Sequence, residues 1–214
     1  KNNQKNIHIT LFPDWETLPY DQFSPHQDII SDRLDALNQL EQNEPVILIA
    51  AVSTLMHRLC PPEFLAQHAF ILKTNQTFQL EPFRARLIDA GYHAVSSVLE
   101  HGEFSVRGGL LDIFPMGSRV PFRIERFDDT VESIRVFDPE TQRTIKQLDH
   151  IRILPARECP LDEKSIAHFR QTFREAFPGN PSLCPVYEAV SQNQFPQGIE
   201  YYLPLFFKQT ATLF

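Results

Sequence analysis

Two arginines and a phenylalanine, Arg107, Arg123 and Phe127, are the residues whose types and spacing best fit a chemical role. Arg123 and Phe127 lie in the run 119–127 (RVPFRIERF), where strand alternation places both on one face. Arg107 is expected on a neighbouring strand. Exposed arginines beside an aromatic ring are the composition of a protein–protein hot spot. A solvated strand face with Phe127 half buried explains the same pattern, and the residues alone do not choose between the two.

The backbone next to Arg107 holds an unusual share of the glycine. The chain has only 7 glycines among 214 residues, and four of them lie between Gly102 and Gly117. Gly108 and Gly109 separate two strand-like runs, which predicts a bulge or a sharp bend. We expect both glycines to support the site by shaping this bend, and to contribute no binding energy themselves.

Familiar catalytic and cofactor motifs do not occur in the sequence. It lacks the GxxxxGK[ST] phosphate loop, the GxGxxG dinucleotide fingerprint, GxSxG and HExxH. The eight histidines form no HxH or HxxxH pair, and the three cysteines form no CxxC pair. A metal site assembled from distant residues stays an alternative. The adjacent Asp128 and Asp129 predict a hairpin turn rather than an acid–base pair. We therefore expect no catalytic residue, no metal and no cofactor.

Composition narrows the class of protein. Hydrophobic residues make up 42% and charged residues 22%, as in globular proteins. Asp and Glu outnumber Lys and Arg by 27 to 20, and this net charge of −7 argues against a sequence-independent DNA binder. No apolar run is long enough for a transmembrane helix, and no signal peptide opens the chain. Lone cysteines suit a reducing cytoplasm. Because the chain begins at Lys1, we expect a piece of a longer cytoplasmic protein.

The first third of the chain predicts alternating strands and helices. Strands are expected at 7–12 and at 45–52, where the apolar run PVILIAAV suits a strand covered on both faces. Helices are expected at 26–41 and at 54–59, the second with Ser53 as its N-cap. This order favours a parallel α/β sheet.

From about residue 69 the pattern changes to short strands with tight turns. One helix is expected at 81–90, followed by Gly91. The short strands after it predict an antiparallel meander. Their expected ranges are 94–99, 103–107, 109–115, 120–127, 131–137, 142–148 and 150–154. Two helices, at 162–177 and 184–192, complete the prediction.

A longer motif, HGEFSVRGGLLDIFP at 101–115, carries a family resemblance. It resembles the signature of the UvrA-binding domain that UvrB helicases share with the bacterial transcription-repair coupling factors (Mfd). Residues 14–33, 111–116 and 198–207 are similar to the coupling-factor sequences. The resemblance to the N-terminal UvrB-homology module of that family covers essentially the whole chain.

The resemblance implies a fold class and a division into domains. The fold class is α/β, a partial RecA-like domain with an inserted antiparallel β-rich domain and then a helical return segment. Residues 1–68 would form part of domain 1a without a nucleotide site. Residues 69–154 would form domain 2, which binds UvrA. Residues 155–214 would begin domain 1b.

The resemblance also implies a function and its residues. The module would be an adaptor that recruits UvrA through Arg107, Arg123 and Phe127, with Gly108 and Gly109 as structural support. Both arginines would contact carboxylates or carbonyls of UvrA. The whole protein would displace RNA polymerase stalled at a lesion, using an ATP- and magnesium-dependent motor on double-stranded DNA. This chain would itself contain no ATPase and no cofactor, and would bind no membrane.

Two other functions stay open. The chain resembles in part a UvrB-type DNA-damage helicase, but the loop between Trp15 and Pro25 has only Tyr20 where UvrB has a tyrosine-rich hairpin. The module would alternatively act mainly as an inhibitory segment, in which another domain of the same protein covers domain 2.

Overall fold

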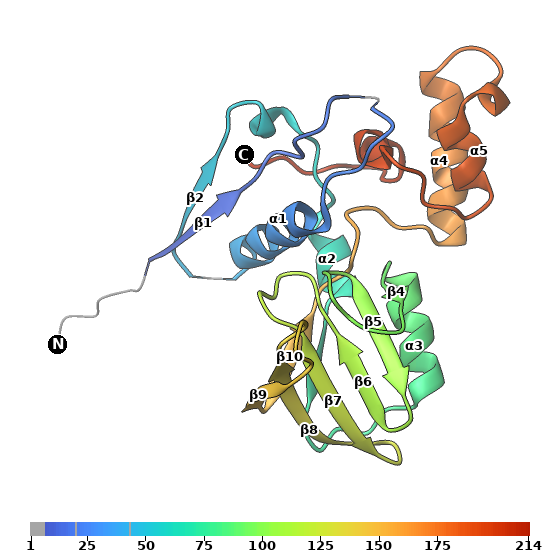
Figure 1. The fold of residues 1–214 in the computed structure, drawn as a ribbon. Coiled ribbons are helices and arrows are strands. Elements are labelled where there is room, and N and C mark those ends of the chain that lie inside the picture. Colours follow the sequence, from blue (N-terminus) through green and yellow to red (C-terminus); the bar gives the residue numbers. More distant parts are fainter. Residues whose placement is uncertain (1–6, 20, 43) are drawn as a thin grey trace.

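The computed structural model describes residues 7–19, 21–42 and 44–214, and Tyr20 therefore lies outside the described residues. Strands β1 (His8–Phe12) and β2 (Val46–Ala50) pair in parallel, and α1 (Gln27–Leu40) connects them (Figure 1). The buried residues of α1 recur at helical spacing, which directs one face of the helix to the core. The expected parallel α/β order is confirmed.

The expectation that the second strand is covered on both faces is wrong. Ile47 and Ile49 of β2 are half exposed, and their neighbours Ile9 and Leu11 of β1 are more exposed still. Within the described residues this sheet has two strands, and α1 packs against them. An apolar run shows that a strand could be buried on both faces, but it does not show that another element packs on each face.

The helix expected at 54–59 is also shorter than predicted. Only Thr54–Met56 are helical, as one 3-10 turn. The expected N-cap is also wrong: the Ser53 hydroxyl donates to Asp14 (3.1 Å) and makes no cap hydrogen bond. A helix that was not predicted, α2 (Pro62–His68), follows. Its first residue is Pro62, a favoured residue at that position, so the start signal was present in the sequence.

The middle of the chain is a six-stranded sheet of order β4-β5-β6-β7-β8-β9. From β5 to β9 every neighbouring pair is antiparallel, which confirms the meander for the strands expected between residues 103 and 148. The strand expected at 94–99 is wrong, because only His93–Ala94 pair there, and they run parallel to β5. The strands are β4 (His93–Ala94), β5 (Glu103–Arg107), β6 (Leu110–Ile113), β7 (Phe122–Phe127), β8 (Thr130–Phe137) and β9 (Thr144–Leu148).

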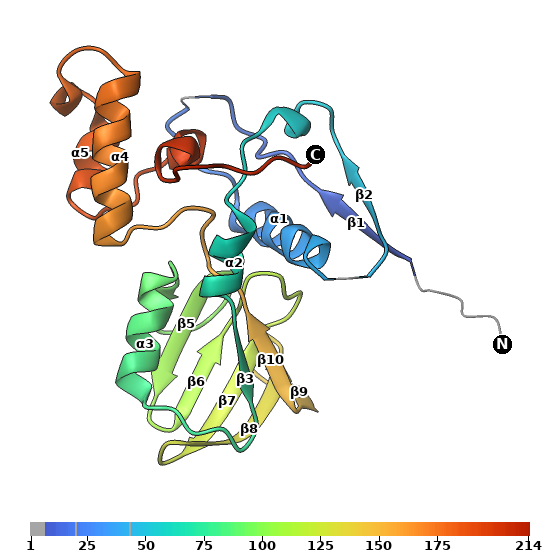
Figure 2. The ribbon, with the colours of Figure 1, turned by 180° about the vertical axis from the view of Figure 1, so that it is seen from behind.

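Strand β10 (His150–Ile153) and helix α3 (Leu80–Asp89) complete the core around the six-stranded sheet. Strand β10 leaves the meander and pairs antiparallel with β3 (Phe70–Lys73), which runs in front of the sheet in Figure 2. Helix α3 contributes Phe83 and Leu87 to the same core. One face of the sheet is therefore packed, and its buried residues include Phe104, Leu111, Ile113, Phe122, Ile124, Val131 and Ile134.

The last part of the chain is helical. Asp162 caps the N-terminus of helix α4 (Glu163–Ala176), where its carboxylate accepts hydrogen bonds from two backbone amides of the first turn. Phe169 and Phe173 pack with α5 (Pro185–Ser191) in a second small core, and a 3-10 helix at Ile199–Leu205 joins it. The mixture of helices and sheets confirms the α/β fold class. The domain borders at residues 68 and 154 stay a prediction.

Candidate protein-binding surface

The turn between β5 and β6 positions Arg107. Arg107 pairs with Leu110, so Gly108 and Gly109 form a two-residue hairpin turn in which Gly108 has a positive φ of 60°. A Cβ on Gly109 would lie 2.7 Å from the Arg126 carbonyl oxygen, so only glycine fits there. The sharp bend is confirmed, and the alternative of a bulge at the glycines is wrong. The bulge lies instead between β7 and β8, at Glu125 and Arg126.

The face of the sheet opposite the core carries the predicted residues, and we call it the outer face. Strand alternation holds as expected: Phe122 and Ile124 are buried in the core, and Arg126 lies over the ring of Phe78. The residues of the outer face include Ser105, Arg107, Leu110, Asp112, Arg123, Glu125, Phe127, Ser133, Arg135 and Phe137.

Arg107 and Arg123 do not lie on neighbouring strands, so that expectation is wrong. Strand β6 runs between them, and its Asp112 joins the two guanidinium groups. Asp112 accepts from Arg107 Nη2 at 2.7 Å, and from Arg123 Nε and Nη2 at 2.7 and 2.8 Å. Its side chain is only 1% exposed. Sequence reasoning missed this residue, although an aspartate in the apolar run LLDI was a visible signal.

The guanidinium group of Arg123 is engaged within the chain. Besides its two bonds to Asp112, it donates to the backbone and side-chain oxygens of Gln142 at 3.0 and 3.1 Å, and lies over Phe137. The hydrogen bond to Asp112 raises the pKa of Arg123 above its usual range. With 14% of its side chain exposed, Arg123 offers little surface to a partner. Its geometry fits a supporting role better than a direct contact.

Arg107 and Phe127 are the accessible members of the predicted set. Half of the Arg107 side chain (51%) is exposed. Phe127 is 72% exposed at the end of β7, where Asp128 and Asp129 form the expected hairpin turn before Thr130. Of the three residues predicted from the sequence, the outer face thus presents the guanidinium group of Arg107 and the ring of Phe127.

A second ion pair borders the first cluster. Glu125 accepts from Arg135 Nη1 at 3.1 Å and from the Ser133 hydroxyl at 2.7 Å. Both partners lie on β8. This pair adds fixed charges of both signs to the outer face, so a partner needs a mixed pattern of charge to match it.

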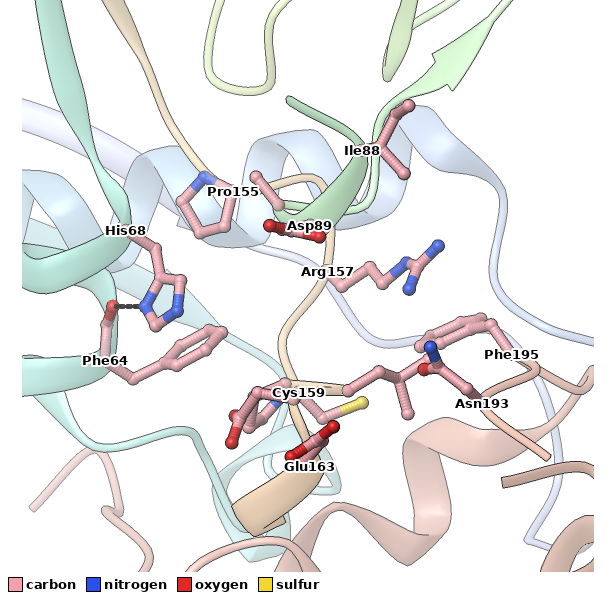
Figure 3. Close-up of a pocket in the computed structure, with 14 residues that line it drawn as sticks. Phe64, His68, Ile88, Asp89, Pro155, Arg157, Cys159, Glu163, Asn193 and Phe195 are labelled. Carbon is pink, nitrogen blue, oxygen red and sulfur yellow. Dashed lines mark hydrogen bonds between the residues drawn. The ribbon is translucent and has the colours of Figure 1, made fainter. Parts of the chain in front are cut away.

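A separate pocket of about 590 Å³ lies where α2, the end of α3 and residues 155–163 meet (Figure 3). His68 lines it, with Nδ1 bonded to the Phe64 carbonyl at 2.7 Å. Burial raises the pKa of the Cys159 thiol, which disfavours its thiolate form. Within the described part of the chain, no cluster of three or more His, Cys, Asp or Glu has the arrangement of a metal site.

The sequence around the six-stranded sheet matches a known protein family. The family model of the UvrB interaction domain matches residues 70–159. The transcription-repair-coupling factor of Haemophilus influenzae is 51% identical over 208 residues, 96% of this chain and 18% of that protein. Its counterparts in Escherichia coli and Bacillus subtilis are 48% and 28% identical over 92% and 96% of the chain.

This chain belongs to the transcription-repair-coupling factor family. It spans less than a fifth of the length of the curated coupling factors that it matches. The matched UvrB interaction domain contains the six-stranded sheet and all residues of the outer face. None of the helices in the described ranges has the length and apolar character that a bilayer crossing needs.

Proposed function

We propose that this chain is the UvrA-recruiting module of a transcription-repair-coupling factor. The supporting observation is an outer face that presents Arg107 and Phe127 inside a UvrB interaction domain. UvrA would offer a carboxylate or carbonyl to the Arg107 fork and an apolar socket to the Phe127 ring. Arg123 would contribute by holding the strands and loops around these two contacts.

For the whole coupling factor, we propose a role in directing repair to stalled transcription. An ATP- and magnesium-dependent motor on double-stranded DNA would displace RNA polymerase stalled at a lesion, and this module would bring UvrA to that place. The module itself would have no enzymatic activity and no cofactor. We also propose a cytoplasmic location, because its three cysteines are free thiols.

The exposure of Phe127 favours one second candidate, an inhibitory contact inside the whole protein. An aromatic ring that is 72% exposed is a suitable docking point for another domain in the resting state. If so, the full-length coupling factor binds UvrA more weakly than this chain does. The UvrB-type helicase is the less favoured alternative, because the relatives named above are coupling factors.

Calorimetric titration of UvrA into this chain tests the proposal. We expect micromolar or tighter binding, which Arg107→Glu weakens at least about tenfold because it places a negative charge where the partner has one. The matched control is Arg84→Glu, the same charge change on an exposed position of α3. No binding by a folded wild-type chain, or equal weakening by the control, would refute the proposal.

A further inference from the structure

A buried aspartate, Asp112, holds the exposed arginine of the outer face in place. We propose that Asp112 is the positioning residue of the surface: it fixes the orientation of Arg107 in which the outer face binds its partner. This inference rests on the proposed function and adds a requirement to it. Asp112 would be needed for binding although it makes no contact with UvrA, since its side chain is 1% exposed.

The hydrogen bonds of Asp112 use both of its carboxylate oxygens. Oδ1 accepts from Arg123 Nε, and Oδ2 accepts from Arg123 Nη2 and from Arg107 Nη2. The Arg123 contact is bidentate, and it fixes the carboxylate plane. Arg107 Nη2 then donates to Oδ2 of a carboxylate whose plane Arg123 already fixes. The order of positioning therefore runs from Arg123 through Asp112 to Arg107.

The charges around Asp112 also favour a positioning role for this residue. Two guanidinium groups meet around one carboxylate, so Asp112 offsets one positive charge and leaves one for a partner. Without the carboxylate, two like charges would lie side by side. The half-exposed Arg107 would then turn into solvent, because Asp112 is its hydrogen-bond partner among the described residues. A mobile arginine has to be ordered again when the partner binds, which weakens binding.

Arg123 extends this framework to the loop between β8 and β9. Its two bonds to Gln142 tie down a residue with a positive φ of 60°, whose side-chain nitrogen donates to the Pro139 carbonyl at 2.7 Å. Loss of Asp112 would loosen this loop as well. The loop and Arg107 would therefore respond together to one substitution in β6.

A double-mutant cycle separates positioning from mere stability. The cycle compares wild type, Asp112→Asn, Arg107→Ala and the double variant by calorimetric titration with UvrA. We expect each single substitution to weaken binding about tenfold or more, and Arg107→Ala to add less than about twofold in the Asp112→Asn background. The matched control is Glu158→Gln, which breaks the buried Arg33–Glu158 ion pair elsewhere. It should lower the melting temperature and leave the Kd unchanged.

Several outcomes would overturn the inference. Asp112→Asn that binds as wild type does, or effects of the two substitutions that multiply, would show that Asp112 does not act through Arg107. If Asp112→Asn has no cooperative melting transition, Asp112→Ser, which also removes the carboxylate, takes its place in the cycle. Nitrogen-15 relaxation of the wild-type guanidinium groups adds a test without a variant, and a freely rotating Arg107 would refute positioning. A folded wild type that does not bind UvrA would overturn the proposed function and this inference together.

Discussion

Replacement of Phe127 by alanine should damage binding far more than folding. A phenylalanine presents about 200 Å² of surface, and 72% of the residue is exposed. The accessible part is therefore about 140 Å². If UvrA buries it fully, about 25 cal/mol per Å² gives about 3.5 kcal/mol, or about 300-fold in Kd. Little of the Phe127 surface is buried in the free chain, so the substitution should lower the free energy of unfolding by no more than about 1 kcal/mol.

The assay is calorimetric titration with UvrA, combined with thermal unfolding of each variant. Phe23→Ala is a matched control, because Phe23 is 71% exposed and lies in the loop before α1, away from the outer face. We expect the Kd of this control to stay within about twofold of wild type, because Phe23 is not a residue of the outer face. A change of less than about tenfold for Phe127→Ala, or an equal loss for Phe23→Ala, would refute the reasoning.

Three further predictions concern the free chain. Burial raises the pKa of Glu200 to about 7, so the folded state holds a proton that the unfolded state loses near 4.5. Stability should therefore fall by up to about 3 kcal/mol between pH 4.5 and 8 relative to Glu200→Gln, measured by urea unfolding at each pH. Gly109→Ala should lower the free energy of unfolding by about 1–3 kcal/mol because of its close approach to the Arg126 carbonyl. ATP with magnesium should neither be hydrolysed nor shift the melting temperature, as enzymatic phosphate release and thermal unfolding would show.

Each of these predictions has a result that would contradict it. Parallel pH profiles for wild type and Glu200→Gln would mean that Glu200 titrates alike in the folded and unfolded states. An unchanged free energy of unfolding for Gly109→Ala would remove the steric argument. Phosphate release that rises with the chain's concentration would show a catalytic site in this part of the coupling factor.

The features that the sequence predicted well are those with a local physical cause. Asp128 and Asp129 gave the turn after β7, and alternation in 119–127 gave the two faces of that strand. The apolar spacing of Phe169 and Phe173 gave α4. In each case the residues that determine the structure lie within a few positions of one another.

The features that were missed depend on long-range pairing. Nothing near β10 indicates that it pairs with β3, about 80 residues earlier, rather than with β9. The joining role of Asp112 likewise depends on the register that sets it opposite Arg123. For the same reason Arg123 appeared to be as available as Arg107, whereas its hydrogen bonds engage it within the chain.

The most direct test of the central claim is photo-crosslinking from the outer face. A photoreactive p-benzoylphenylalanine at position 127 should form a covalent adduct with purified UvrA, because Phe127 is exposed and its ring would lie in the proposed interface. The same group at position 23, on an equally exposed phenylalanine, should form none. No adduct from position 127, or equal yields from both positions, would contradict the claim that this face binds UvrA.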